Sequence, residues 1–312
     1  MRITVVGAGG TGGYYGALLA KHGQDVTFVA RGAHLQAIQK EGLQVKSIFG
    51  DFRLSPANAT DDVSRLPTPD LILFCTKTYD TDEAVRKIKP IVGETTTILS
   101  LQNGIDAAER IGGALGMQHM IAGATWISSA VEAPGVIRQA SDFRRVVLGE
   151  LDGRRTERVQ AIFEAFRETG VTVELSQEIL KIVWTKFVFL SAAGSLGSLT
   201  RLPVGAYRAV PETRVFIARL MHEVEALARA CGVDLEAGIV EQSMAFLDKN
   251  APHIKASMQL DVEAGRRTEI ESIIGVIVRK GRERGVAVPT AEMIYALLLP
   301  VEMNARGAAK PS

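Results

Sequence analysis

A glycine-rich loop near the N-terminus constrains the fold of this chain more than any other feature. It has the G-x-G-x-x-G spacing and consists of Gly7, Ala8, Gly9, Gly10, Thr11 and Gly12. A β-branched run at residues 2–6 precedes the loop, a helix-like segment at Tyr14–His22 follows it, and Asp25–Val29 has the composition of a second strand. An ordinary glycine turn lacks this context. This succession of strand, glycine loop, helix and strand predicts a βαβ unit that holds a dinucleotide pyrophosphate at the N-terminus of its helix.

Further apolar runs extend this unit into a doubly wound sheet. Leu71–Cys75, Thr96–Ser100 and Met120–Ala124 are separated by helix-like segments, as parallel strands buried on both faces require. Two strands that pair with each other, a helix and a last strand are then expected at Gly135–Gln139, Arg144–Gly149, Arg155–Glu168 and Val171–Leu175.

From about Ser176 the pattern changes to apolar residues three and four positions apart, which is typical of helices. The expected helices are Gln177–Ser191, Glu212–Cys231, Leu235–Leu247 and Glu269–Arg284, and the polar tail Asn304–Ser312 is expected to fray. A chain of 312 residues is long enough for two cores. We therefore expect an α/β, Rossmann-type, NADP-binding domain at 1–175 and an all-α substrate-binding and catalytic domain at 176–312.

Composition excludes several classes of function. The 36 Lys and Arg residues nearly balance the 35 Asp and Glu residues, so a nucleic-acid partner is not expected. The chain opens without a secretory leader, and its longest apolar stretch, Phe187–Leu199, falls short of the roughly 20 residues that span a bilayer, so a cytoplasmic protein without a membrane span is predicted. No metal is expected, because the five histidines lack paired ligand spacing. Glu212–Cys231 leaves two roles open, a homodimer interface or the spine of its domain.

The end of the second predicted strand indicates which dinucleotide binds. An NAD site carries Asp or Glu there to bond the ribose 2′-hydroxyl, whereas this chain reads Val29-Ala30-Arg31. A guanidinium pairs well with a 2′-phosphate, so NADP(H) is the expected cofactor. Lys77 and Asn103 follow the next two predicted strands, at the sheet edge where cofactors bind, although an Asn-Gly pair can also be only a turn.

An ordered series of motifs resembles the ketopantoate reductase (2-dehydropantoate 2-reductase) family across nearly the whole chain. The series comprises the glycine loop, Arg31, Lys77, Gln102-Asn103-Gly104, Trp184-Thr185-Lys186, Ser257-Met258, Asp261, Gly265-Arg266, Thr268-Glu269-Ile270-Glu271 and Gly285–Thr290. The resemblance implies an NADP-dependent oxidoreductase that reduces ketopantoate to pantoate, a step of pantothenate synthesis, in the cleft between two domains. It also implies that Lys186 is the general acid, that Glu269 holds substrate and ammonium, that Ser257 binds the substrate carboxylate, and that Asn103 lies at the nicotinamide end.

Elementary chemistry is compatible with these roles. Hydride addition to a ketone builds negative charge on oxygen, so a nearby proton donor stabilises the transition state. Lys186 lies in an apolar helical segment, where it either serves a site or extends its ammonium to water. Glu269 is otherwise a helix-start carboxylate after Thr268, and Ser257 is otherwise a surface serine.

Two positions depart from the family pattern. Leu190 and Gly194 stand where the family has asparagines, four and eight residues after the lysine and on its face of the helix. A site without these amides tolerates a more apolar substrate. A reductase of another small 2-oxo acid and a non-catalytic NADPH-binding sensor therefore stay open as alternatives. Arg201 is either a substrate carboxylate clamp or a solvated arginine at a helix end.

Overall fold

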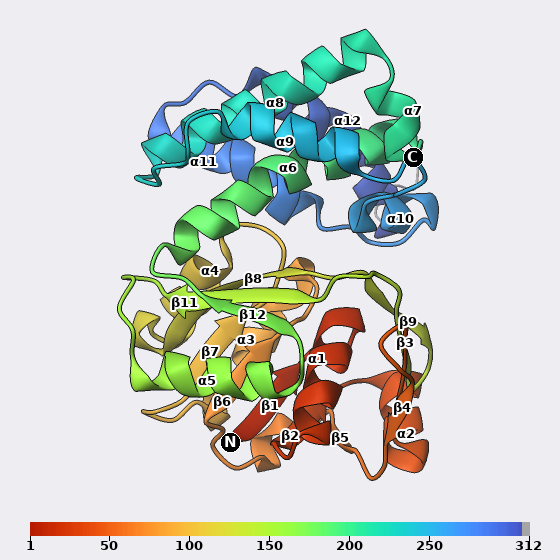
Figure 1. The fold of residues 1–312 in the computed structure, drawn as a ribbon, viewed down its shortest axis with the longest axis vertical. Helices are drawn as coiled ribbons and strands as arrows, with labels where there is room; N and C mark the ends of the chain where they lie inside the picture. Colours follow the sequence, from red (N-terminus) through yellow and green to blue (C-terminus); the bar gives the residue numbers. More distant parts are fainter. Residues whose placement is uncertain (308–312) are drawn as a thin grey trace. The chain divides into compact units, whose positions relative to one another are not determined.

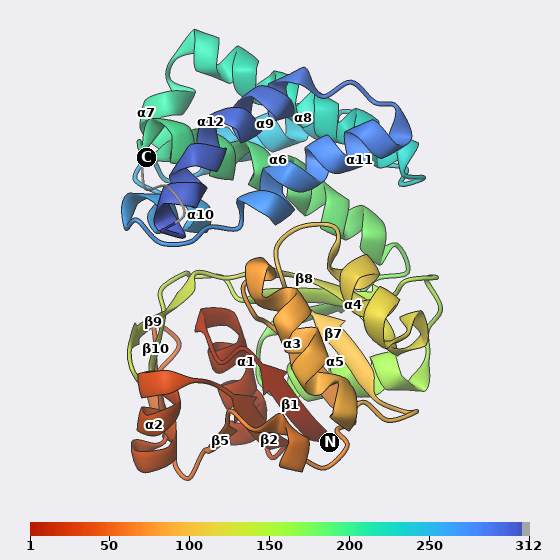
Figure 2. The ribbon, with the colours of Figure 1, turned by 180° about the vertical axis from the view of Figure 1, so that it is seen from behind.

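The computed structural model describes residues 1–307, which form two compact units (Figure 1, Figure 2). One unit holds Met1–Gln102 and Ala107–Ile179, and the other holds Asn103–Asp106 together with the chain from Leu180 onward. The short segment Asn103–Asp106 thus belongs with the C-terminal helices, although it lies in the sequence between two strands of the α/β unit.

The α/β unit is built on an eight-stranded sheet with the order β12-β11-β8-β7-β6-β1-β2-β5. The strands are β1 (Arg2–Val6), β2 (Asp25–Val29), β5 (Asn58–Thr60), β6 (Leu71–Phe74), β7 (Thr97–Ser100), β8 (Met120–Trp126), β11 (Arg145–Glu150) and β12 (Thr172–Leu175). All neighbouring pairs are parallel except β8 and β11. The run β5-β2-β1-β6-β7-β8 is the Rossmann order, and its direction reverses between β1 and β6.

Helices cover both faces of this sheet. They are α1 (Gly10–Lys21), α2 (Gly32–Glu41), α3 (Thr81–Ile88), α4 (Ala107–Leu115) and α5 (Glu157–Glu168). Alternate strand residues point to opposite faces, so Val5 packs in the core that contains residues of α1 and α5, while Val6 packs with residues of α3 and α4. Figure 2 shows α3 and α4 on the face turned toward the viewer. The predicted doubly wound α/β fold is confirmed.

A second, four-stranded sheet has the order β4-β3-β10-β9 and was not predicted. Its strands are β3 (Leu43–Ser47), β4 (Phe52–Leu54), β9 (Ser129–Ala133) and β10 (Val136–Gln139). The predicted pairing of Gly135–Gln139 with Arg144–Gly149 is wrong, because β10 pairs with β3 and β9, whereas β11 pairs with β8 and β12. Alternation of apolar residues identifies a strand but carries no information about its partner.

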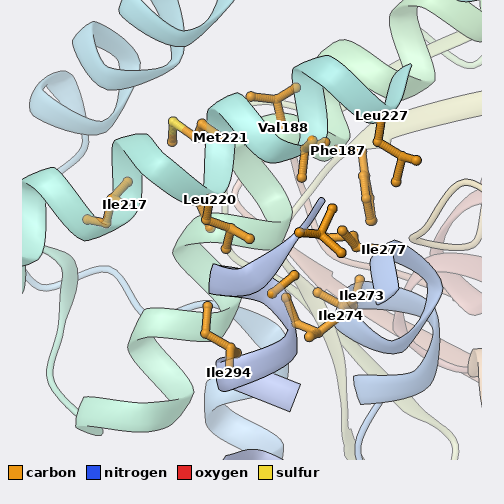
Figure 3. Close-up of a cluster of buried hydrophobic side chains, with 14 of the residues drawn as sticks. Phe187, Val188, Ile217, Leu220, Met221, Leu227, Ile273, Ile274, Ile277 and Ile294 are labelled. Carbon is orange, nitrogen blue, oxygen red and sulfur yellow. The ribbon is translucent and has the colours of Figure 1, made fainter. Parts of the chain in front are cut away.

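The second unit is helical, and residues 180–307 contain no strand. Its elements are α6 (Ile179–Thr200), α7 (Val204–Arg208), α8 (Pro211–Ala230), α9 (Ile239–Lys249), α10 (Ser257–Glu263), a π-helical turn (Glu271–Gly275), α11 (Val276–Arg284) and α12 (Pro289–Ala305). Figure 3 shows the apolar core, in which Phe187 of α6, Leu220 and Leu227 of α8, Ile273 of the π turn and Ile294 of α12 pack together.

Two expectations for this unit were wrong. Helix α6 runs nine residues past the predicted end at Ser191, because Ala192 and Leu196 pack in the apolar core. Serine is tolerated in this part of the helix, where the Ser198 hydroxyl donates to the Gly194 carbonyl at 2.7 Å. Helix α12 was missed entirely, and it reaches Ala305, inside the tail expected to fray; residues 308–312 of that tail lie outside the described residues.

The length of α6 also changes the comparison with a membrane span. By length and composition alone this helix could cross a bilayer, which the shorter apolar stretch did not suggest. Half of its most apolar 18-residue stretch is buried inside the structure. Core helices of soluble proteins can have the same length and apolar composition, so these two properties are weak evidence for a membrane span. Buried Phe187 and Val188, both labelled in Figure 3, place one side of the helix in the apolar core. Ala192 belongs to the same core.

Candidate active site

The glycine loop is fixed by close backbone approaches. Gly7 has a φ of +98°, and a Cβ built on it would lie 2.7 Å from the Thr76 nitrogen, just beyond β6. A Cβ on Gly12 would lie 2.2 Å from the Gly7 carbonyl oxygen. Glycine at both positions lets the loop pack directly against the end of the neighbouring strand, so closely that no side chain would fit. This contact lies at the point where the strand order reverses.

Gly9 gives the loop its open side. A Cβ built on Gly9 would meet nothing within 4 Å, and Gly9 is the N-cap of the 12-residue helix α1, whose first turn carries no acidic residue. Free N–H groups of Gly10 and Thr11 begin the helix, where the helix dipole favours an anion. The space and the donors therefore fit the pyrophosphate of a dinucleotide.

A histidine that the sequence analysis did not single out supports this loop. His34 of α2 lies with Nε2 2.8 Å from the carbonyl oxygen of Ala8, and its Nδ1 accepts a 3.0 Å hydrogen bond from the Gly135 N–H. Because Nδ1 accepts, the ring proton is on Nε2 and is donated to Ala8. His34 thus ties the glycine loop to the turn between β9 and β10.

Arg31 and the Lys77 segment meet at the same edge of the sheet. Arg31 is the N-cap of α2, its side chain is 73% exposed, and its guanidinium lies 3.0 Å from the Asp80 carboxylate. Half-buried Lys77 is the residue before the turn Thr78–Asp80. The buried Gln102 amide donates to the Thr76 carbonyl at 3.0 Å and so holds the beginning of that segment.

A second group of predicted residues meets within the helical unit. The ammonium of Lys186, on α6, donates a 2.9 Å hydrogen bond to Oδ1 of Asn103. Gly104, with a φ of +107°, allows the Asn103 segment to pack against the π turn, since a Cβ there would lie 2.9 Å from the Ser272 carbonyl oxygen. Glu269 lies just before this turn and is 6% exposed. Asn103 therefore belongs to the helical unit, together with Lys186, and the glycine loop belongs to the α/β unit.

Burial and a neighbouring charge both shift the pKa of Lys186. Burial disfavours its charged form and lowers the pKa of Lys186 to about 8, although the charge of Glu269 opposes that shift. Part of the side chain still reaches solvent. A lysine with this pKa is protonated at neutral pH and gives up its proton more readily than an ordinary lysine, so it can act as a general acid.

The remaining predicted positions lie farther along α6, at its end, and at the start of α10. Gly194 is two turns after Lys186, about 12 Å along the helix axis, and a Cβ there would meet only Met258 Cε, at 3.8 Å. Half-buried Leu190 lies between them, and exposed Ser257 begins α10. Arg201 is exposed and ends α6 in a left-handed conformation with a φ of 59°.

Three residues that contact the predicted site residues or their neighbours were not predicted. His34 and Asp80 act through partners distant in sequence, which no local pattern reveals. Glu302 is almost fully buried and bonds to Thr268, directly before Glu269. A lone carboxylate in the apolar run of 296–303 was the available signal for it.

Within the described residues 1–307, no group of three or more His, Cys, Asp or Glu side chains could hold a metal ion. The candidate site residues are the glycine loop with Arg31 in one unit, and Lys186 with Asn103 and Glu269 in the other.

Comparison with known proteins agrees with both halves of this description. The family model described as "Ketopantoate reductase PanE/ApbA" matches residues 3–153, and the model of its C-terminal region matches residues 178–302. An uncharacterized oxidoreductase of Bacillus subtilis, YkpB, is 30% identical over 96% of this chain and 98% of its own length. A 2-dehydropantoate 2-reductase from Nostoc is 30% identical over 94% of this chain and 93% of its own.

A solved structure extends this likeness to three dimensions. The 2-dehydropantoate 2-reductase of Geobacter metallireducens has a TM-score of 0.89 and 34% sequence identity, covering 96% of this chain and 99% of its own. The predicted resemblance is confirmed. The chain belongs to the ketopantoate reductase family and is an NADP-dependent oxidoreductase.

Proposed function

We propose that this protein reduces ketopantoate to pantoate with NADPH, and that Lys186 donates the proton. The observation that carries the proposal is the ammonium of Lys186 held by Asn103, beside Glu269, with a pKa near 8. Similarity to proteins named 2-dehydropantoate 2-reductase supports the choice of substrate. In this proposal residues 1–175 form the NADP domain and residues 176–312 the substrate domain, with Asn103 acting alongside the latter.

The cofactor would be held by residues of the α/β unit. The N–H groups at the start of α1 would bind the pyrophosphate, beside the open side of Gly9. Arg31, whose guanidinium is largely exposed, would pair with the 2′-phosphate, and Lys77 would add a second cation. When bound, NADPH supplies the hydride.

Lys186 would act on the substrate carbonyl. Its ammonium would donate a hydrogen bond and then a proton to the oxygen, which becomes more negative during reduction. The Asn103 amide oxygen orients the ammonium, and the charge of Glu269 raises the pKa of Lys186 against the effect of burial. Glu269 would also accept a hydrogen bond from a substrate hydroxyl, and the exposed Ser257 hydroxyl would donate to the substrate carboxylate.

Leu190 and Gly194 favour a second candidate, another small 2-oxo acid with a more apolar side group. A Cβ built on Gly194 would have only Met258 Cε within 4 Å, so this position lacks an amide and has an apolar neighbour. Such a surface gains little from a hydroxyl on the substrate.

The test is NADPH oxidation by the purified protein with a panel of 2-oxo acids. We expect kcat/KM to be highest for ketopantoate, and Lys186→Ala to lower it by roughly a thousandfold. Lys181→Ala, a change on the same helix, is the matched control and should retain activity. A higher kcat/KM for an apolar 2-oxo acid would select the second candidate. NADPH binding without turnover of any acid would select the sensor.

A further inference from the structure

A buried carboxylate on the last helix holds the backbone next to Glu269. Glu302 of α12 is 1% exposed, and its Oε2 accepts two hydrogen bonds from one residue, at 2.7 Å from the Thr268 N–H and at 2.6 Å from the Thr268 hydroxyl. Its other oxygen accepts from Arg306 Nε at 2.6 Å and lies 3.8 Å from Arg267 Nε. The charge of Glu302 is thus compensated on one side and directed at Thr268 on the other.

These bonds fix Glu269 from its N-terminal side. Thr268 is itself 3% exposed and is joined by a peptide bond to Glu269. On the other side, the Glu269 carbonyl accepts the N–H groups of Ser272 and Ile273, both at 3.0 Å, as the π turn begins. Little backbone freedom is left at Glu269, because hydrogen bonds restrain it in both directions along the chain.

Packing alone does not account for a carboxylate here. A buried charge costs free energy unless it is paired, and an apolar side chain would fill the same place on α12 without that cost. A carboxylate makes stronger hydrogen bonds to N–H and O–H donors than a neutral acceptor does, so it holds Thr268 more firmly.

We infer that Glu302 is a positioning residue, which holds Thr268 and through it the Glu269 carboxylate beside Lys186. The inference rests on the proposed function, since it assigns Glu302 to the reaction through Lys186. Glu269 is the charged group whose field acts on Lys186, and Arg267 and Arg306 are the charged groups at Glu302. Loosening the Thr268 contact should therefore weaken the field of Glu269 at the ammonium.

Glu302→Gln tests this by removing the charge while keeping the shape. We expect kcat/KM to fall roughly tenfold, and its alkaline limb to move to lower pH in the same direction as in Glu269→Gln. Thr268→Val, which removes the hydroxyl but keeps the N–H, should give a smaller shift, and the double variant should be less than additive. If Glu302→Gln does not fold, Thr268→Val tests the inference by itself, through the shift of the alkaline limb.

A second readout does not need turnover. NMR titration of ¹³C-methylated lysines in the full-length protein, with the Lys186 signal assigned by Lys186→Arg, reports the Lys186 pKa directly. We expect that pKa to be lower in Glu302→Gln than in the unchanged protein. If Lys186→Ala stays fully active, the proposed function fails, and this titration still decides whether Glu302 acts on Lys186.

The matched control is Glu223→Gln. The Glu223 carboxylate, on α8, accepts the N–H groups of Thr290 at 2.7 Å and Ala291 at 2.9 Å, so it caps the same helix α12 at its other end. We expect this change to lower Tm without moving the alkaline limb or the Lys186 pKa. If Glu302→Gln and Thr268→Val behave in that same way, Glu302 is only a structural tie and the inference is overturned.

Discussion

The Lys186 ammonium donates its 2.9 Å hydrogen bond to an asparagine 83 positions earlier in the chain, Asn103. Asn103 reaches Lys186 because the segment Asn103–Asp106 packs with the helical unit, although the residues on both sides of it belong to the α/β unit. The cluster around Lys186 therefore joins three separate segments: helix α6, the loop Asn103–Asp106, and the residues just before the π turn, which include Glu269.

The first prediction concerns the pH dependence of reduction. Lys186 must carry a proton to donate one, and burial lowers its pKa to about 8, so kcat/KM should fall as pH rises through about 8. The charge of Glu269 raises that pKa, so Glu269→Gln should move the alkaline limb to lower pH. Rates measured from pH 6 to 10 check this.

The control for this profile is Glu271→Gln. Glu271 lies two residues after Glu269 and pairs with Arg279 at 2.7 Å, so its loss should leave the limb in place. An alkaline limb near pH 10 in the unchanged protein would contradict the first prediction.

The second prediction is that Lys186 costs stability. The unfolded chain keeps the Lys186 proton up to about pH 10.5, while the folded protein releases it near pH 8. The unfolded state thus binds more protons between these values, and Lys186 makes stability rise with pH across that interval. Below pH 8 the full cost of the buried ammonium is present.

Lys186→Met should therefore raise Tm by a few degrees at pH 7, even though Glu269 loses a neighbouring cation. The gain should shrink toward pH 10, where the folded protein already holds a neutral lysine. Thermal denaturation at both pH values measures it, with Lys181→Met as the control. A variant less stable than the unchanged protein at pH 7 would show that the attraction to Glu269 outweighs burial.

The success of sequence reasoning depended on how local each signal was. Gly7, Gly9 and Gly12 were predicted together because a tight turn, an open face and a close approach all lie within one loop. Strand β2 was predicted with its observed bounds, since it lies directly between the α1 region and Arg31. Lys186 and Glu269 became candidates only through the family resemblance, since an apolar helix with one lysine has an ordinary explanation.

What sequence reasoning missed depends on contacts between distant segments. Sheet β4-β3-β10-β9 joins strands almost a hundred positions apart, and six strands, β4 to β9, separate β3 in the sequence from its parallel partner β10. Helix α12 was missed because Pro300 and an unbroken apolar run hide its period, although the proline lies within the helix. Tertiary packing decides such elements, and the local pattern does not record it.

The third prediction concerns cofactor choice. In the structure Arg31 is paired with Asp80 at 3.0 Å, so a 2′-phosphate would compete with this carboxylate for the guanidinium. Asp80→Asn should increase the preference for NADPH over NADH a fewfold, whereas Arg31→Ala should lower it by about tenfold to a hundredfold. The ratio of kcat/KM values for the two cofactors measures both. A reduced preference in Asp80→Asn would mean that Asp80 orients Arg31 for the phosphate.

The fourth prediction concerns His34. Its ring donates to the Ala8 carbonyl and accepts from the Gly135 N–H, so His34→Ala removes the link between the glycine loop and the turn between β9 and β10. We expect KM for NADPH to rise roughly tenfold with little change in kcat, because in the proposed function the loop holds the cofactor and takes no part in the chemical step. His22→Ala, at the opposite end of α1, is the control. An equal effect of both changes would indicate a general loss of stability.

The last prediction separates substrate recognition from helix stability at Gly194. A Cβ at this position would meet only Met258 Cε, at 3.8 Å, so a Cβ is accommodated on α6 there without a clash. Gly194→Asn places an amide on the Lys186 face of the helix, where it should increase kcat/KM for ketopantoate relative to an apolar 2-oxo acid by roughly tenfold. Asparagine and alanine are also better helix formers than glycine, so either change stabilises the helix interior by up to about 1 kcal/mol.

Gly194→Ala isolates that second effect. It should raise Tm as the asparagine variant does, but leave the ratio of kcat/KM values unchanged, because a methyl group offers no hydrogen bond. If alanine and asparagine shift the ratio equally, the free volume beside Met258 controls the choice of substrate, and the missing amide does not. Measuring both variants with ketopantoate and with a branched apolar 2-oxo acid decides between size and hydrogen bonding at this position.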